Sequence, residues 1–301
     1  MKKVIFPVLL IFLFILSACQ GSPTPQVDLA PEAGVAESAP AEEVPANTPV
    51  PPPTPTTEPD FDPQPAAAQR MTFTAEDGIE LVGYYYPAAV PNAPVIVLMH
   101  WARGDQNDWP KNGMVDWLQN RGTAHGTNIP AQQSVIYPPM PENLSFAVFT
   151  FDFRGFNESS GEFDPAGGLM DAKAAYAFAK TLEGVDATRI AGIGSSIGAD
   201  GVVDGCDEGC IGALSLSPGG YLGVVYTEAV KVLDDAEKPV TCIAAEGDIP
   251  SAIACDATTG KYYEKILYVG GEHGDQFYQN PPEGFGDMLY DWLVRVFEIE
   301  S

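Results

Sequence analysis

The residues most able to do chemistry form the segment G-S-S-I-G at positions 194–198, which places Ser196 at the centre of a G-x-S-x-G pattern. Residues 189–193 before it are typical of a short buried strand, and residues 199–203 after it can begin a helix. A serine at such a sharp turn adopts a strained backbone, and small residues flank it because strand and helix approach closely. The pattern predicts a nucleophilic serine; the alternative is a glycine-rich loop without chemistry.

A serine hydroxyl is almost fully protonated at neutral pH, so it becomes a nucleophile only with a base beside it. The chain has three histidines. His273 lies in the segment G-G-E-H-G at 270–274, directly after the last predicted strand. We expect it at the carboxyl edge of the sheet, the same edge as Ser196, which makes it the candidate base. The alternative is a surface histidine without a catalytic role.

A histidine base needs a carboxylate that fixes its tautomer and stabilises the imidazolium. The strand predicted at 240–245 is followed by Glu246, Gly247 and Asp248. Two acids therefore stand where such a partner is expected, and either can also be a solvated loop acid.

Strands and helices alternate along the rest of the chain after an opening hairpin. Residues 70–76 and 79–86 are predicted strands joined by a turn at Asp77-Gly78. Further strands are predicted at 94–99, 145–153, 211–216, 240–245 and 265–269, and helices at 169–182, 224–233, 253–263 and 288–299. This alternation predicts an α/β fold with a mainly parallel, doubly wound sheet. Residues 217–238 leave room for little beyond one helix, so we expect no large cap domain there.

This order of elements resembles the α/β-hydrolase fold over roughly residues 70–300. The serine motif, the segment D-F-R-G-F-N-E-S at 152–159 and the late His-Gly resemble the dienelactone-hydrolase and small carboxylesterase branch of that superfamily. Members often carry D-x-R-G-x-G-x-S, whereas Asn157 replaces the second glycine here; we interpret the segment as a structural turn. The resemblance implies a triad in the order Ser196, Asp248, His273, with Glu246 as the fallback acid.

The resemblance also implies that backbone N–H groups of Ile197 and Trp101 hold the oxyanion of a tetrahedral intermediate. The segment H-W-A-R-G at 100–104 resembles the family's H-G-x-x-G loop, with Trp101 where glycine is usual, which would narrow the acyl pocket. His100 stands too early in the chain for the triad order, so we expect it to brace this loop by hydrogen bonding. Arg103 is interpreted as a surface or salt-bridged arginine rather than a group that orients an acidic substrate.

The amino terminus has the features of an export signal. Lysines at positions 2 and 3 precede an apolar run at 4–16, as in the n-region and h-region of a signal peptide. The segment L-S-A-C at 16–19 resembles the lipobox of bacterial lipoproteins, which implies removal of residues 1–18 and acylation of Cys19. The alternative is an ordinary secretory signal followed by a chance cysteine. We therefore expect an extracytoplasmic protein that is lipid-anchored to a bacterial membrane.

Residues 19–68 are mostly Pro, Ala, Glu and Thr with almost no large apolar side chains, which predicts a disordered, semi-stiff tether. The globular domain is predicted at 69–301. The formal net charge of −26 argues against nucleic acid as a partner, because both would be polyanions.

Besides Cys19 the chain has four cysteines, and an exported location permits disulfides between them. The local pairs Cys206–Cys210 and Cys242–Cys255 are favoured, although the sequence allows three pairings. A zinc site is less favoured because no C-x-x-C segment occurs.

Residues 122–143 form a long loop rich in Pro, Thr and Gln, and long loops of this kind are often lids. We hypothesise that it overhangs the site. His125 in this loop has no neighbours with metal-ligand spacing, so no metal is predicted.

The sequence thus predicts a serine hydrolase that cleaves small-molecule carboxylic esters or related acyl bonds through an acyl-enzyme, without a cofactor. A peptidase or acyltransferase with the same triad, and a noncatalytic binding lipoprotein on this scaffold, are the alternatives. A nucleotide-binding protein is disfavoured, because Ile197 stands where a G-x-G-x-x-G pattern needs glycine.

Overall fold

A computed structural model of the chain describes residues 64–121, 136–141 and 143–299. The predicted signal peptide, Cys19, nearly all of the predicted tether, His125 and most of the 122–143 loop lie outside these residues. None of the helices in the described residues has the length and apolar character that crossing a membrane requires.

Within the described residues the strands form one eight-stranded sheet with the order β1-β2-β4-β3-β5-β6-β7-β8. β2 runs antiparallel to β1 and to β4, and the remaining neighbours are parallel. The predicted fold class is therefore confirmed: a mainly parallel sheet with an amino-terminal antiparallel hairpin. The strands are β1 (Gln69–Thr74), β2 (Glu80–Tyr86), β3 (Ala93–Met99), β4 (Ala147–Phe151), β5 (Val185–Ser195), β6 (Cys210–Leu216), β7 (Val240–Ala245) and β8 (Tyr263–Tyr268).

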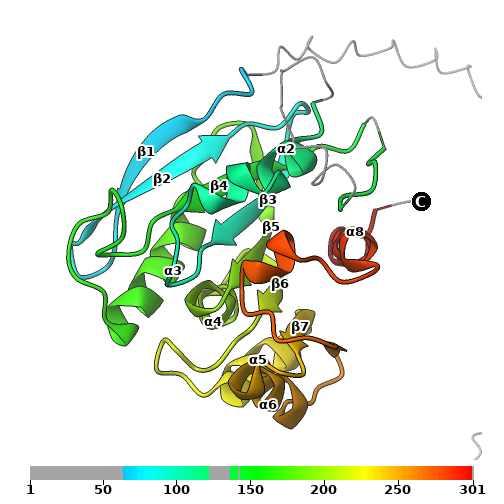
Figure 1. Cartoon of the computed structure of the whole chain (residues 1–301). Helices are drawn as coiled ribbons and strands as arrows, with labels where there is room; N and C mark the ends of the chain where they lie inside the picture. The colour runs from blue at the N-terminus through cyan, green and yellow to red at the C-terminus, as the bar shows by residue number, and fades with distance from the viewer. Residues whose placement is uncertain (1–63, 122–135, 142, 300–301) are drawn as a thin grey trace, which may run out of the picture. The chain divides into compact units, whose positions relative to one another are not determined.

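Helices cover both faces of this sheet (Figure 1). They are α1 (Asp108–Lys111), α2 (Met114–Gln119), α3 (Pro165–Ala179), α4 (Ile197–Asp204), α5 (Tyr226–Asp235), α6 (Ile249–Ala257), α7 (Gln276–Gln279) and α8 (Phe285–Phe297). Helices α3 to α6 pack on one face with Val97 and Met99 of β3, and α1, α2, α7 and α8 pack on the other with Ile96 and Leu98. Because successive strand residues point to opposite faces, a strand buried on both faces is apolar throughout, as β3 is.

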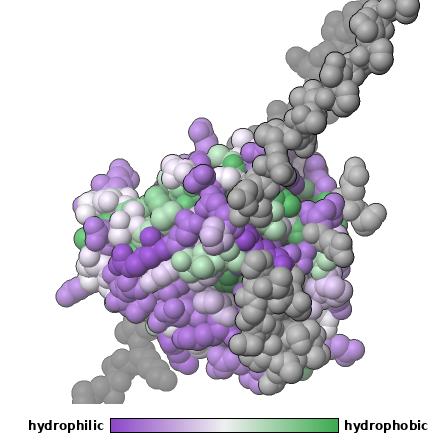
Figure 2. All heavy atoms as spheres, turned by 90° about the horizontal axis from the view of Figure 1, so that it is seen from above, coloured by the Kyte–Doolittle hydropathy of each residue, from purple (hydrophilic) through white to green (hydrophobic). Residues whose placement is uncertain are grey.

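The apolar side chains gather in these two cores. The face seen in Figure 2 is accordingly mostly hydrophilic, with hydrophobic side chains in smaller patches between polar ones.

The predicted helix boundaries differ from the observed ones where capping residues act. α3 begins at Pro165 rather than at 169, because the Asp164 side chain accepts a hydrogen bond from Gly167 N (2.9 Å) and proline suits the first helical position. The helix predicted at 253–263 is wrong over most of its length, since α6 starts at Ile249 and ends at Ala257. The short helices α1, α2 and α7 were not predicted, because a single turn carries almost no periodic signal.

Both predicted disulfides form, Cys206–Cys210 and Cys242–Cys255. Cys242 lies in β7 and Cys255 in α6, and both side chains are buried in the core. The second bridge therefore closes a short loop around Asp248, which lies between the two elements.

We predict that the double substitution Cys242→Ala with Cys255→Ala lowers the free energy of unfolding by about 3 kcal/mol, because a loop of this size loses its constraint in the unfolded chain. Thermal unfolding followed by circular dichroism measures the change. The matched control is Cys206→Ala with Cys210→Ala, whose smaller loop predicts a loss of about 2 kcal/mol. An unchanged Tm for the first pair would show that the bridge does not stabilise the fold.

Candidate active site

Ser196 occupies the turn between β5, which ends at Ser195, and α4, which begins at Ile197. Its backbone has φ 55° and ψ −113°, a conformation that costs free energy for any residue with a side chain. Three hydrogen bonds hold it there. Ser196 N donates to Leu216 O (2.8 Å), and Ser196 O accepts from the N–H groups of Ala199 (2.9 Å) and Asp200 (3.2 Å).

The glycines beside Ser196 are required by contacts between backbones. A Cβ atom on Gly194 would lie 2.0 Å from Gly198 O, and a Cβ atom on Gly198 would lie 2.1 Å from Met99 O. No side chain fits at such distances, so the G-x-S-x-G spacing records how closely α4 approaches β5 and β3.

Ser196, His273 and Asp248 form a continuous hydrogen-bonded chain. His273 Nε2 lies 2.9 Å from Ser196 Oγ, and His273 Nδ1 lies 2.8 Å from Asp248 Oδ2. With the proton on Nδ1, the imidazole donates a hydrogen bond to the Asp248 carboxylate, and its Nε2 accepts a hydrogen bond from the serine hydroxyl. The structure therefore brings together the three residues that the sequence proposed, each just beyond the carboxyl end of a parallel strand. The fallback acid Glu246 has an exposed side chain and makes no hydrogen bond to His273.

The three hydrogen-bonded residues differ in how far they are exposed to solvent. The side chain of Asp248 is 9% exposed, that of His273 is 28% exposed, and Ser196 as a residue is 6% exposed. The acid is thus shielded while the imidazole edge meets solvent, which suits a base that exchanges protons with a substrate.

Two side chains that were not predicted from the sequence hold the histidine loop. Gln276 Oε1 accepts a hydrogen bond from His273 N (2.8 Å), and Ser217 Oγ accepts one from Gly274 N (3.0 Å). Ser217 directly follows β6, so its place at the carboxyl edge was a usable signal. Gln276 gave none, because its contact depends on the turn that the loop makes before α7.

The two proposed oxyanion donors are backbone N–H groups at the carboxyl edge. Ile197 is the first residue of α4 and Trp101 follows β3, and neither N–H donates to another group among the described residues. Neither N–H group therefore has a protein acceptor among the described residues that would compete with a ligand, and for Ile197 this is usual at the start of a helix.

The Trp101 indole fills space beside Ser196 that would be open if this position were glycine. Its Nε1 donates to Asp108 Oδ2 (3.1 Å), and a Cβ atom on Gly104 would collide with that pair. The position where Gly274 would carry a Cβ lies 3.3 Å from Trp101 Cε3 and 3.6 Å from Ser196 Cβ. The indole is thus fixed beside the nucleophile.

His100 holds the loop around Trp101 by hydrogen bonding, as predicted from the sequence. Phe153 N donates to His100 Nε2 (3.0 Å), and Nδ1 lies 2.8 Å from Trp101 O. Complete burial lowers the pKa of His100 to about 4, so the ring stays neutral and links the loops that follow β3 and β4.

The 152–159 segment is a structural turn. Arg154 binds the carboxylates of Asp171 (2.8 Å) and Asp77 (2.6 Å), and Asp152 accepts hydrogen bonds from Gln106 N and from the Asn157 side chain. Asn157 has φ 38°, which explains how asparagine replaces a glycine there. Arg103 is exposed, and no carboxylate of the described residues pairs with it.

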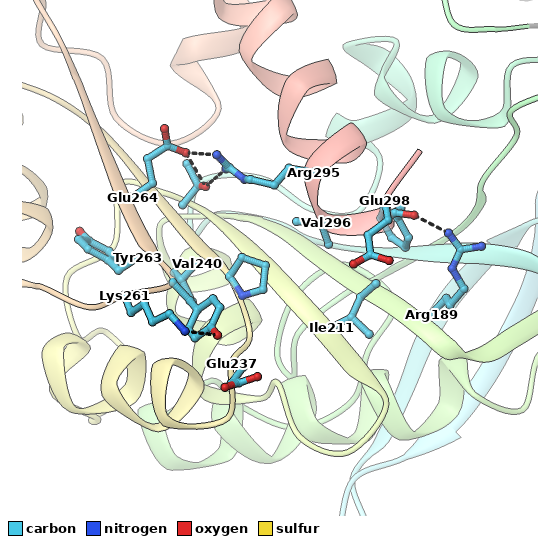
Figure 3. Close-up of a pocket in the computed structure, with 14 residues that line it drawn as sticks. Arg189, Ile211, Glu237, Val240, Lys261, Tyr263, Glu264, Arg295, Val296 and Glu298 are labelled. Carbon is cyan, nitrogen blue, oxygen red and sulfur yellow. Dashed lines mark hydrogen bonds and ion pairs between the residues drawn. The ribbon is translucent and has the colours of Figure 1, made fainter. Parts of the chain in front are cut away.

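A hollow of about 680 Å³ lies at the opposite edge of the sheet (Figure 3). It is bounded by the amino ends of β6, β7 and β8 and by the end of α8. Its cations already have partners: Arg295 pairs with Glu264 (2.6 Å), Arg189 donates to Phe297 O (2.7 Å), and Lys261 donates to the Tyr262 hydroxyl (2.7 Å). This hollow cannot present a substrate to Ser196, which lies at the carboxyl edge.

The chain is similar to known proteins over most of its described length, although no family model matches it. The uncharacterized protein YfhR of Escherichia coli K12 is 24% identical over 269 residues, which cover 80% of this chain and 86% of YfhR. YfhR of Salmonella typhi is 30% identical over 169 residues, or 54% of this chain and 49% of that protein.

Solved structures share the fold at low sequence identity. The Pyrococcus furiosus esterase Pf2001 superposes with a TM-score of 0.55 at 16% identity, covering 76% of this chain and 92% of the esterase. The α/β hydrolase GrgF from a Penicillium species gives a TM-score of 0.53 at 13% identity, covering 77% of this chain and 100% of GrgF. The chain therefore has the α/β-hydrolase fold.

We predict that Gly194→Ala lowers the Tm by several degrees, because its methyl group has no space next to Gly198 O. Differential scanning fluorimetry measures the shift. Gly271→Ala is the matched control, since a Cβ atom there meets nothing within 4 Å. Equal Tm values for the two variants would contradict the close approach of α4 to β5.

Proposed function

We propose that this chain is a serine hydrolase that cleaves carboxylic esters or related acyl bonds, of the dienelactone-hydrolase or small carboxylesterase type. The observation that supports this function is the continuous hydrogen-bonded chain Asp248–His273–Ser196, with the serine on a strained turn. The esterase name of the Pyrococcus furiosus neighbour agrees with it. The partial match of the 152–159 segment to the dienelactone-hydrolase pattern, with Asn157 in place of the second glycine, supports the branch.

In the acylation step, Ser196 Oγ attacks the carbonyl carbon of the substrate while His273 Nε2 takes the hydroxyl proton. Asp248 stabilises the resulting imidazolium through its hydrogen bond with Nδ1. The N–H groups of Ile197 and Trp101 hold the oxyanion of the tetrahedral intermediate. The bond between carbon and leaving oxygen then breaks, and the alcohol leaves with the proton from Nε2.

In the deacylation step, water replaces the alcohol. His273 Nε2 removes a proton from the water as its oxygen bonds to the acyl carbon. Collapse of the second tetrahedral intermediate breaks the acyl–serine bond, and Nε2 returns the proton to Ser196. These steps need no cofactor.

We expect a fluorophosphonate probe to label the soluble domain on Ser196, because the probe reports a serine activated by a base. Ser196→Ala should abolish labelling and lower the kcat for p-nitrophenyl acetate by about 10³-fold or more. Ser195→Ala is the matched control, since that side chain is fully buried and makes no hydrogen bond to His273. Peptide mapping identifies the labelled serine.

Absence of labelling in a folded wild-type protein would refute the proposed hydrolase function. It would favour the noncatalytic binding lipoprotein, which retains the fold without turnover. Labelling that survives Ser196→Ala would place the nucleophile elsewhere.

We further propose that Cys19 is the lipid attachment site and that the protein acts outside the cytoplasm on a bacterial membrane. The support is the lipobox-like segment at 16–19 behind an apolar run. Full-length protein expressed in a bacterium should incorporate labelled palmitate and sediment with membranes. Cys19→Ser should lose both properties, whereas Cys206→Ser with Cys210→Ser should keep them. Equal incorporation in the Cys19→Ser variant would reject the anchor.

A further inference from the structure

Asp200 is a buried carboxylate that the hydrolase mechanism does not use. It lies on α4 one turn beyond Ser196 and is 1% exposed. No arginine or lysine of the described residues pairs with it. Instead its two oxygens accept backbone N–H groups, one from Gly219 (3.1 Å) and one from Tyr221. A buried carboxylate without a cation is costly, so its hydrogen bonds explain how it is accommodated.

These N–H groups belong to the loop between β6 and α5, which also contacts the histidine. The Tyr221 ring meets the His273 ring edge-on, with centroids 6.2 Å apart and an interplanar angle of 81°. A Cβ atom on Gly219 would lie 2.4 Å from Tyr221 Cζ, so the ring packs directly over that glycine. The Asp200 carboxylate therefore binds the backbone of the two residues, Gly219 and Tyr221, whose packing places this ring.

The charge of the triad acid also acts on the Tyr221 phenol. The negative charge of the Asp248 carboxylate disfavours ionisation of the phenol. Burial raises the pKa of the phenol above its ordinary value, so it stays neutral in this position. Tyr221 thus packs against the imidazole of the Asp248–His273 hydrogen bond, and its phenol lies in the field of the Asp248 carboxylate.

We propose, on the basis of the hydrolase function above, that Asp200 is a positioning residue which holds the Tyr221 ring against the imidazole of His273. Asp200 acts as a carboxylate, because only the ionised form accepts both N–H groups without a competing proton. Tyr221 keeps the imidazole in the orientation in which Nε2 faces Ser196. Helix α4 thereby follows the nucleophile Ser196 directly and also positions the Tyr221 ring that packs beside its base, His273.

This arrangement makes the activity sensitive to acid. Burial raises the pKa of Asp200 to about 6, against the opposing effect of the backbone N–H groups. The titratable groups that face it are Asp204 on α4, Tyr221 on the loop and Tyr226 on α5. As the pH falls below 6, Asp200 takes up a proton, the loop loses an acceptor, and Tyr221 is released.

The test compares Asp200→Asn with Asp204→Asn in the soluble domain. Asp204 lies one turn further along the same helix, and neither of its carboxylate oxygens has a hydrogen-bond partner among the described residues. We expect Asp200→Asn to lower kcat for p-nitrophenyl acetate at pH 8 by about tenfold, with KM changed less. The acid limb of its pH profile should lose the contribution of Asp200 and become less steep than that of the wild type. Asp204→Asn should match the wild type in both respects.

Substitutions of Tyr221 decide the outcome if Asp200→Asn folds poorly. Tyr221→Phe retains the ring against His273 and should keep most of the kcat, whereas Tyr221→Ala should show the tenfold loss. The proton NMR signal of His273 Nδ1–H gives a readout that needs no substrate. It should broaden by faster exchange with water in Asp200→Asn and Tyr221→Ala, but not in Asp204→Asn.

Failure of this inference is distinct from failure of the hydrolase. A wild-type protein that hydrolyses the ester, with Asp200→Asn and Tyr221→Ala equal to Asp204→Asn in kcat, pH profile and NMR signal, overturns the positioning role alone. A wild-type protein that neither hydrolyses esters nor reacts with the probe overturns the hydrolase. The NMR comparison then still decides whether Asp200 and Tyr221 hold the histidine.

Discussion

The close approach of α4 to the sheet is the constraint on which the rest of the site depends. Gly198 packs against Met99 O, and Gly194 packs against Gly198 O. Only this contact allows the chain to turn from β5 into α4 within one residue, which forces Ser196 to φ 55°. The same contact brings the first N–H of α4 next to the loop after β3, so the strain at the serine and the position of Ile197 have one cause.

The three side chains meet because parallel strands end at a common edge. β5, β7 and β8 lie in one sheet, and Ser196, Asp248 and His273 follow their carboxyl ends. Loops at such an edge vary in conformation unless something fixes them. Here the Cys242–Cys255 bridge ties α6 to β7 around the acid, while Ser217 and Gln276 hold the histidine loop. The sheet thus sets the approximate positions of the three triad residues, and the disulfide and the hydrogen bonds set the distances between their side chains.

Some of this could be predicted from the sequence and some could not, for physical reasons. Buried strands such as β3 are continuous apolar runs, and the chain order of Ser196, Asp248 and His273 follows from strand order, so fold class and triad candidates were accessible. Contacts between loops could not be predicted from the sequence. The fit of Tyr221 over Gly219 depends on backbone angles in a loop that has no periodic pattern. α6 was misplaced because its start is set by the turn at Asp248 and Pro250, not by an apolar repeat.

The two acids of α4 show why a carboxylate can be buried one turn beyond the nucleophile. A negative charge near a helix amino terminus is favoured by the helix dipole, but there it also repels the oxyanion that the same terminus would bind. At Asp200 the N–H groups of Gly219 and Tyr221 compensate the charge, so its field at Ile197 is weakened. Asp204 lacks such donors among the described residues, and burial together with the charge of Asp200 raises its pKa to about 8. Asp204 therefore stays largely protonated at neutral pH, which leaves one compensated charge on the helix that carries Ser196.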